Sequence, residues 1–68
     1  MNEGLANSLK DERARLGLTQ AELADRIGVS RKTINTVENG VFVPSTVLAL
    51  ELARALETTV EGLFFLKD

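Results

Sequence analysis

Apolar residues recur along the chain at the three- and four-residue spacing of helices, and this pattern predicts five of them. No β-branched run is longer than three residues, so we expect an all-α protein. The expected helices cover residues 5 to 16, 20 to 27, 31 to 38, from Pro44-Ser45 to about 57, and 60 to 65.

Capping residues mark the ends of these helices. In the first helix, side chains at i, i+4 spacing form one stripe. It consists of Leu5, Leu9, Arg13 and Leu16, and is apolar except for Arg13. Gly17 should end this helix in the left-handed conformation. Thr19 followed by Glu22 forms a capping box for the second helix, which should bury Leu23, Ala24 and Ile27.

The stretch from residue 19 to 40 has the pattern of a helix-turn-helix. Ala24 supplies a small residue where two helices approach, Gly28 supplies a corner, and Val29 turns into the core. Ser30 should cap the third helix, and Ile34 with Val37 should form its inner face before Asn39-Gly40 ends it. The outer face is then formed by Arg31, Lys32, Asn35 and Thr36.

Sixty-eight residues suffice for one domain of limited stability, which we expect to span 1–68 with its helix-turn-helix at 19–40 and a dimerisation region at about 41–68. The chain has no cysteine and no histidine, so we expect neither a metal nor another cofactor. The amino terminus has no signal-peptide pattern, and no 18 apolar residues run together. We therefore expect a soluble protein of the cytoplasm, located at the prokaryotic nucleoid, without membrane contact or small-molecule ligand.

The net charge of −2 argues at first sight against a nucleic-acid partner, because phosphate contacts require concentrated positive charge. Six of the eight cations nevertheless lie in the first half of the chain: Lys10, Arg13, Arg15, Arg26, Arg31 and Lys32. We expect a modestly basic face on an acidic body.

The chain from about residue 7 to 65 resembles the Cro/repressor-type (Xre-like) helix-turn-helix regulators, as a small stand-alone member. The resemblance includes Pro44-Ser45 before Leu48-Ala49-Leu50 and the closing Leu63-Phe64. It implies a compact five-helix fold like that of lambda repressor, with the third helix as the recognition helix in the major groove of double-stranded operator DNA.

Within this motif, the outer face of the third helix is the candidate base-contacting surface. Arg31 and Lys32 lie on the exposed first turn, which is the part of a recognition helix that reaches base edges. An arginine there is suited to a bidentate contact with guanine O6 and N7. Asn35 could contact adenine or a phosphate, and Thr36 a thymine methyl group or the backbone. The alternative is that all four form an ordinary solvated helix face.

The start of the second helix is the candidate phosphate contact. Gln20 lies beside free backbone amides after Thr19, and in the family the matching glutamine holds a phosphate and braces the recognition helix. Alternatively, Gln20 is an exposed helix former. Asn39 is either a helix cap or a further phosphate contact.

The resemblance also implies an ion pair between Arg13 and Glu38. A buried pair would matter greatly for stability, whereas an exposed pair would matter little. The connection Val41-Phe42-Val43 departs from the family, whose members often have Lys, Arg or Asn there, so fewer DNA-backbone contacts are expected from it.

The carboxy-terminal third has more apolar surface than so small a core can absorb, which indicates a homodimer. Leu63 and Phe64 are expected in the core. The interface candidates are Val47 and Leu50 on the fourth helix and Phe65 with Leu66 near the end, in a short terminal strand.

These patterns favour a sequence-specific, homodimeric transcriptional repressor that binds an inverted-repeat operator. An antitoxin or a restriction-modification control protein would have the same motif. A protein-interaction module with this fold is the alternative of another class, supported by the acidic sequence pI near 5.0. An enzyme is the least favoured class, because the nucleophile, base and phosphate-loop patterns are missing from the sequence.

Overall fold

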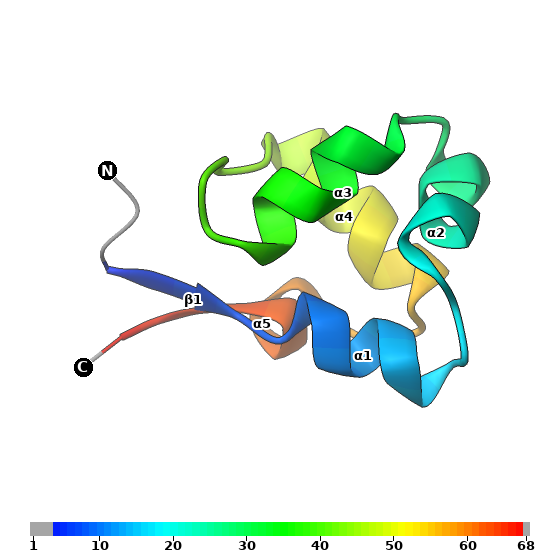
Figure 1. Cartoon of the computed structure of the whole chain (residues 1–68). Helices are drawn as coiled ribbons and strands as arrows, with labels where there is room; N and C mark the ends of the chain where they lie inside the picture. Colours follow the sequence, from blue (N-terminus) through cyan, green and yellow to red (C-terminus); the bar gives the residue numbers. More distant parts are fainter. Residues whose placement is uncertain (1–3, 68) are drawn as a thin grey trace.

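In the part of the chain that the structure describes, five short helices surround an apolar core, and two strands far apart in the sequence pair beside them (Figure 1). The computed structural model describes residues 4–67. The elements, in chain order, are β1 (Leu5–Asn7), α1 (Leu9–Arg15), α2 (Gln20–Ile27), α3 (Arg31–Glu38), α4 (Thr46–Ala55), α5 (Val60–Leu63) and β2 (Phe64–Leu66). None of the helices in the described range is long and apolar enough to cross a bilayer.

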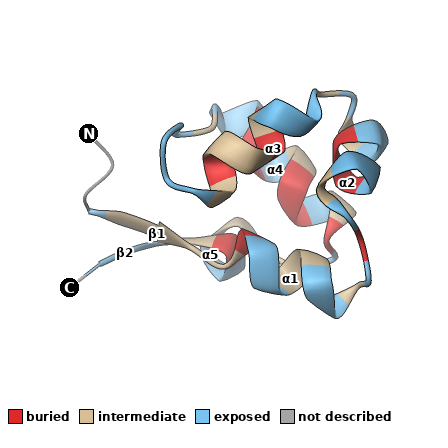
Figure 2. Ribbon diagram, viewed as in Figure 1, coloured by how far each residue is buried: buried red, intermediate tan, exposed pale blue. Residues whose placement is uncertain are grey.

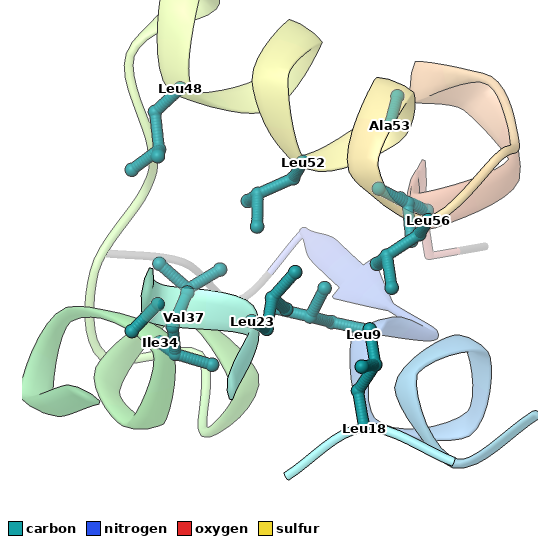
Figure 3. Packing of buried hydrophobic residues seen from close by; sticks show 11 residues of the cluster. Leu9, Leu18, Leu23, Ile34, Val37, Leu48, Leu52, Ala53 and Leu56 are labelled. Carbon is teal, nitrogen blue, oxygen red and sulfur yellow. The ribbon is translucent and has the colours of Figure 1, made fainter. Parts of the chain in front are cut away.

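The core lies between α4 and the amino-terminal half of the chain. Figure 3 shows Leu52 of α4 and Leu56, which follows the helix, pointing toward Leu9 and Leu23. The buried apolar residues are Leu9, Leu18, Leu23, Ala24, Ile34, Val37, Leu48, Ala49, Leu52, Ala53, Leu56 and Leu63. Every side chain assigned to the inner faces of the second and third helices contacts this cluster, although Ile27 and Val29 are only partly buried.

Local capping explains where α2 begins and ends. The Thr19 hydroxyl accepts from the backbone N–H of Glu22 at 3.0 Å, and the Glu22 carboxylate accepts from the N–H of Thr19 at 2.8 Å. This confirms the predicted capping box. Gly28 ends the helix with φ of 73°, in the left-handed region that glycine adopts without strain.

The fourth helix is shorter than predicted. The Ser45 hydroxyl caps its start by accepting from the backbone N–H of Leu48 at 3.1 Å. The helix was expected to continue to about residue 57, but it ends at Ala55. Glu57 has φ of 59°, which takes the chain out of the helix.

The prediction that a helix begins at Leu5 is wrong. Residues 5–7 form β1, which runs antiparallel to β2 with Leu5 opposite Leu66 and Asn7 opposite Phe64. Helix α1 begins only at Leu9, whose backbone N–H donates to the Asn7 side-chain oxygen at 3.0 Å. Leu5 therefore does not continue the helical stripe, and the all-α description is approximate.

The last helix is also shorter than the predicted range of 60 to 65. The Thr59 hydroxyl caps α5 through the N–H of Gly62, but the helix ends at Leu63, and Phe64 is already extended. The prediction that Phe65 and Leu66 lie in a terminal strand is confirmed. Leu63 is fully buried and Phe64 packs against the core while remaining partly exposed.

Candidate nucleic-acid interface

Helices α2 and α3 form the helix-turn-helix. The N–H of Val29 donates to the carbonyl oxygen of Ala24 at 3.0 Å, which folds the corner back on α2. Ile34 and Val37 hold the inner face of α3 in the core with at most 1% of either residue exposed. In Figure 2 the first turn of α3 is exposed, so the helix presents its amino-terminal end to solvent.

The predicted base-contacting residues share this solvent-facing side of α3. Arg31 and Lys32 are exposed, whereas Asn35 and Thr36 are half-buried. The Ser30 hydroxyl caps the helix by accepting from the backbone N–H of Thr33 at 3.1 Å. The two cations therefore project from a helix start that is fixed by its cap.

Glu38, in the last turn of α3, is the centre of a polar network with side chains from α1 and α2. Its carboxylate accepts from Arg13 Nε at 2.7 Å and Arg13 Nη2 at 3.3 Å. The Arg13 side chain is 14% exposed and the Glu38 side chain 5% exposed, so the pair is largely buried. Arg13 Nη1 also donates to the Leu18 carbonyl oxygen at 2.8 Å.

Gln20 joins the same network from the first residue of α2. Its Nε2 atom donates to Glu38 Oε1 at 3.0 Å. A side-chain amide nitrogen has two hydrogens, so this bond leaves the second one available to another acceptor. Glu38 thus fixes the position of Gln20 at the amino-terminal end of α2.

The capping box occupies the polar groups of Thr19. Its backbone N–H and its side chain both stabilise the charged form of the Glu22 carboxyl and lower the pKa of that group below its ordinary value of 4.5. The Thr19 hydroxyl therefore satisfies the N–H of Glu22, and the N–H groups of Gln20 and Ala21 are the ones at this helix start that have no partner within the helix.

Asn39 lies at the carboxy-terminal cap of α3 and is exposed. Its side-chain nitrogen donates to Asn35 Oδ1 at 3.2 Å. The two amides therefore form one polar surface along the outer side of the helix.

Asn7 has a role that the sequence reasoning missed. Its Nδ2 atom donates to the carbonyl oxygens of Val37 and Glu38 at 3.2 and 3.4 Å, while its Oδ1 accepts from Leu9. One side chain thus connects the strand pair, the start of α1 and the end of α3. The only hint in the sequence is an Asn-Ser pair before an apolar helix, which is a usual helix-start signal.

The basic surface is smaller than the clustering of cations suggested. Arg13 is bound to Glu38, and Arg15 donates to Glu12 at 2.8 Å and to the Leu56 carbonyl oxygen at 2.9 Å. Arg31 and Lys32 therefore supply the positive charge at the start of α3.

A second surface is apolar and lies on the far side of α4 from the core. Val47 is 66% exposed and Leu50 is 57% exposed. Leu50 lines a groove of about 390 Å³, whose walls are formed by Leu5, Val43, Pro44, Thr46, Ala49, Leu50, Val60 and Phe64. Phe65 and Leu66 are also exposed, on β2 beside this region.

A capped, exposed helix start with two cations, held at a fixed angle by a glycine corner, defines a helix-turn-helix DNA-binding protein. The HTH_3 helix-turn-helix model matches residues 9–63, and the chain belongs to this family. It is a DNA-binding transcriptional regulator of the helix-turn-helix type.

The relatives span almost the whole chain. An uncharacterized HTH-type transcriptional regulator, YgzD, from Bacillus subtilis (strain 168) is 38% identical over 94% of this chain and 97% of its own length. An uncharacterized HTH-type transcriptional regulator from Methanothermobacter thermautotrophicus is 46% identical over 88% of each chain.

Solved structures have the same fold. The restriction-modification controller protein C.AhdI from Aeromonas hydrophila matches with a TM-score of 0.74 and 35% identity, over 79% of this chain and 78% of its own. The clp gene regulator ClgR from C. glutamicum matches with a TM-score of 0.73 and 33% identity, over 76% and 67%.

Proposed function

We propose that the chain is a sequence-specific repressor that binds an inverted-repeat operator as a homodimer, with α3 in the major groove of each half-site. The main observation in favour is the exposed pair Arg31 and Lys32 on the first turn of a helix whose other face is locked into the core. Side chains at the start of a recognition helix are those that reach base edges.

Four side chains on α3 have the proposed role of base contacts. Arg31 would form a bidentate contact with guanine O6 and N7, and Lys32 would donate to the same edge of a neighbouring base. Asn35 would contact adenine. Thr36 would offer its methyl group, because its hydroxyl already donates to the Thr33 carbonyl oxygen at 3.0 Å.

The proposed phosphate contacts come from the two flanks of α3. Gln20 would donate its second amide hydrogen to a phosphate oxygen while Glu38 holds the first. Thr19 would contribute through its position at the dipole end of α2, and Asn39 through its exposed amide. These contacts would fix the register of the helix on the duplex.

The modest positive charge of this face sets the expected strength of binding. Nonspecific affinity depends on how many phosphates are neutralised, and the chain has a net charge of −2. We expect modest affinity at physiological salt, a salt dependence no steeper than the few neutralised phosphates allow, and a need for both half-sites.

The apolar surface beside the groove is the proposed dimer interface. Val47 and Leu50 on α4, with Phe65 and Leu66 on β2, expose large apolar side chains. A two-fold dimer buries one surface of each subunit against the same surface of the other and places two recognition helices about 34 Å apart. The groove adds Val43 and Val60, which the sequence reasoning did not assign to the interface.

Occupation of an operator would exclude polymerase from an overlapping promoter, which is why we propose repression. The proposed site of action is DNA, so the proposed location is the nucleoid in the cytoplasm.

Selection from a random duplex pool at low salt tests this function, with wild type beside the double variant Arg31→Ala/Lys32→Ala. We expect wild type to enrich an inverted repeat and the double variant to enrich nothing. Failure of wild type to enrich any sequence would contradict the proposal and favour a module that binds protein instead.

A further inference from the structure

The chain leaving α3 folds back against the outer side of this helix. After Gly40, with φ of 73°, the N–H groups of Val41 and Phe42 both donate to the Thr36 carbonyl oxygen, at 2.9 and 3.2 Å. Val41 is 73% exposed and Phe42 is 47% exposed, although both are apolar. An aliphatic and an aromatic side chain are thus held at the edge of the proposed DNA-reading surface.

These two side chains form one wall of a hollow of about 360 Å³. Its lining consists of Ser30, Lys32, Thr33, Thr36, Val41 and Phe42. Lys32 and Thr36 belong to the proposed base-contacting set, so the hollow is continuous with that surface. The apolar wall and the Lys32 cation therefore border the same part of the proposed DNA-facing surface.

The hydroxyl groups in the hollow are already engaged within the protein. Ser30 Oγ accepts from the Thr33 N–H and pairs with Thr33 Oγ1 at 3.0 Å, and Thr36 Oγ1 donates to the Thr33 carbonyl oxygen. Apart from the Lys32 side chain, what the hollow offers a ligand is mainly apolar contact, from the two threonines, Val41 and Phe42.

We propose that this hollow receives the 5-methyl group of a thymine in each half-site, and that Phe42 is the specificity-determining residue that covers it. The 5-methyl group of thymine is the apolar group that base pairs present in the major groove, and phenylalanine and threonine methyl groups are side chains that contact it. The inference rests on the proposed function, because it assumes that α3 enters the major groove.

The test removes only the methyl group from the DNA. Each thymine of a duplex enriched by wild type is replaced, one position per half-site, by 2′-deoxyuridine, and Kd is measured by fluorescence anisotropy. We expect one position at which loss of the thymine methyl group weakens wild-type binding about fourfold per half-site. This factor corresponds to about 0.8 kcal/mol, the value for one buried methylene-sized group. Phe42→Ala should bind the thymine and deoxyuridine duplexes equally.

Val43→Ala is the matched control, because Val43 is 50% exposed, lies in the same connection and does not line the hollow. It should retain the wild-type ratio of the two Kd values even if overall affinity falls. Phe42→Leu, which keeps an apolar side chain, should retain part of the ratio, and circular dichroism melts check that each variant is folded.

Two results would overturn the inference while leaving the proposed function intact: equal binding of both duplexes by wild type at every position, or an unchanged ratio in Phe42→Ala. A wild-type protein that binds no selected duplex would instead overturn the proposed function, and this inference with it.

Discussion

Arg13 and Glu38 form a two-point ion pair, with Nε to Oε2 at 2.7 Å and Nη2 to Oε1 at 3.3 Å, and so connect α1 to the last turn of the recognition helix. Because Gln20 donates to the same carboxylate, the pair fixes both helices of the helix-turn-helix. The pair therefore links the stability of the fold to the geometry of the DNA-facing surface.

Glu38→Ala should destabilise the fold strongly, because it leaves the largely buried Arg13 guanidinium without its partner. Removal of one member of a buried pair costs about 3–5 kcal/mol. Each kcal/mol shifts the melting temperature of a domain of this size by about 4–8 °C, so a thermal melt should fall by more than about 10 °C. The double variant Arg13→Met/Glu38→Leu should recover part of this loss, and a drop of only a few degrees in Glu38→Ala would contradict a buried role.

Asn7→Asp should weaken the junction of the strand pair with α3. Aspartate can still accept from Leu9, but it cannot donate to the carbonyl oxygens of Val37 and Glu38, and its charge is unfavourable beside them. We expect a loss of about 1–3 kcal/mol in urea denaturation at pH 7.

The difference between Asn7→Asp and wild type should shrink in acid, because a protonated aspartate can donate a hydrogen bond again. Both proteins are compared at the same pH, which removes the contribution of other carboxylates. A difference that does not change with pH would mean that the carbonyl contacts of Asn7 are unimportant.

The pKa of Glu22 predicts a second, separate pH effect. A carboxyl whose pKa is lower in the folded than in the unfolded state stabilises the fold at pH values above its unfolded pKa. This contribution is lost as the pH falls through the lower, folded-state pKa of Glu22. Glu22→Gln should therefore show a flatter dependence of unfolding free energy on pH below 4.5, and identical slopes would refute the role of the capping box.

Arg31→Ala should weaken binding to the selected operator and relax the preference at one base pair. Loss of a bidentate arginine contact costs about 1–3 kcal/mol, or roughly 5–150-fold in Kd. Arg54→Ala removes the same charge from α4, where Arg54 is exposed outside the helix-turn-helix, and is the control. An equal effect of both substitutions would indicate general electrostatic attraction rather than base recognition.

Leu50→Asp should convert the proposed dimer to a monomer, because it places a charge in the centre of the apolar surface on α4. Sedimentation equilibrium of wild type and variant measures this directly. Val41→Asp is the control, since Val41 is exposed but does not line the groove. A wild type that is monomeric at high micromolar concentration would refute the dimer itself.

The sequence predicts α2 and α3 almost to the residue because their signals are local. The Thr19 to Glu22 capping box, Gly28 and the Ser30 cap each act within a few residues. The outer face of α3 follows from the same local periodicity, and this is why the candidate base contacts could be chosen from the sequence.

A terminal strand at Phe65 and Leu66 was expected, but β1 and its pairing with β2 could not be predicted, because the two strands are far apart in the sequence. Leu5 is extended because it pairs with Leu66 at the other end of the chain, and its own sequence context favours a helix. Asn7 escaped notice for the same reason: its partners Val37 and Glu38 are distant in sequence. Arg13 and Glu38 are equally distant, and their pairing was expected only from the family resemblance.

The pairing of β1 with β2 also brings two distant parts of the chain close enough to be joined by a covalent link. The N–H of Lys67 donates to the carbonyl oxygen of Gly4 at 2.8 Å, so a short turn could join these two positions into a hairpin. New ends could then open in the exposed connection between α3 and α4. In such a circular permutant the pairing of β1 with β2 becomes a local contact, which lowers the entropic cost of forming the sheet, and we expect the protein to fold faster.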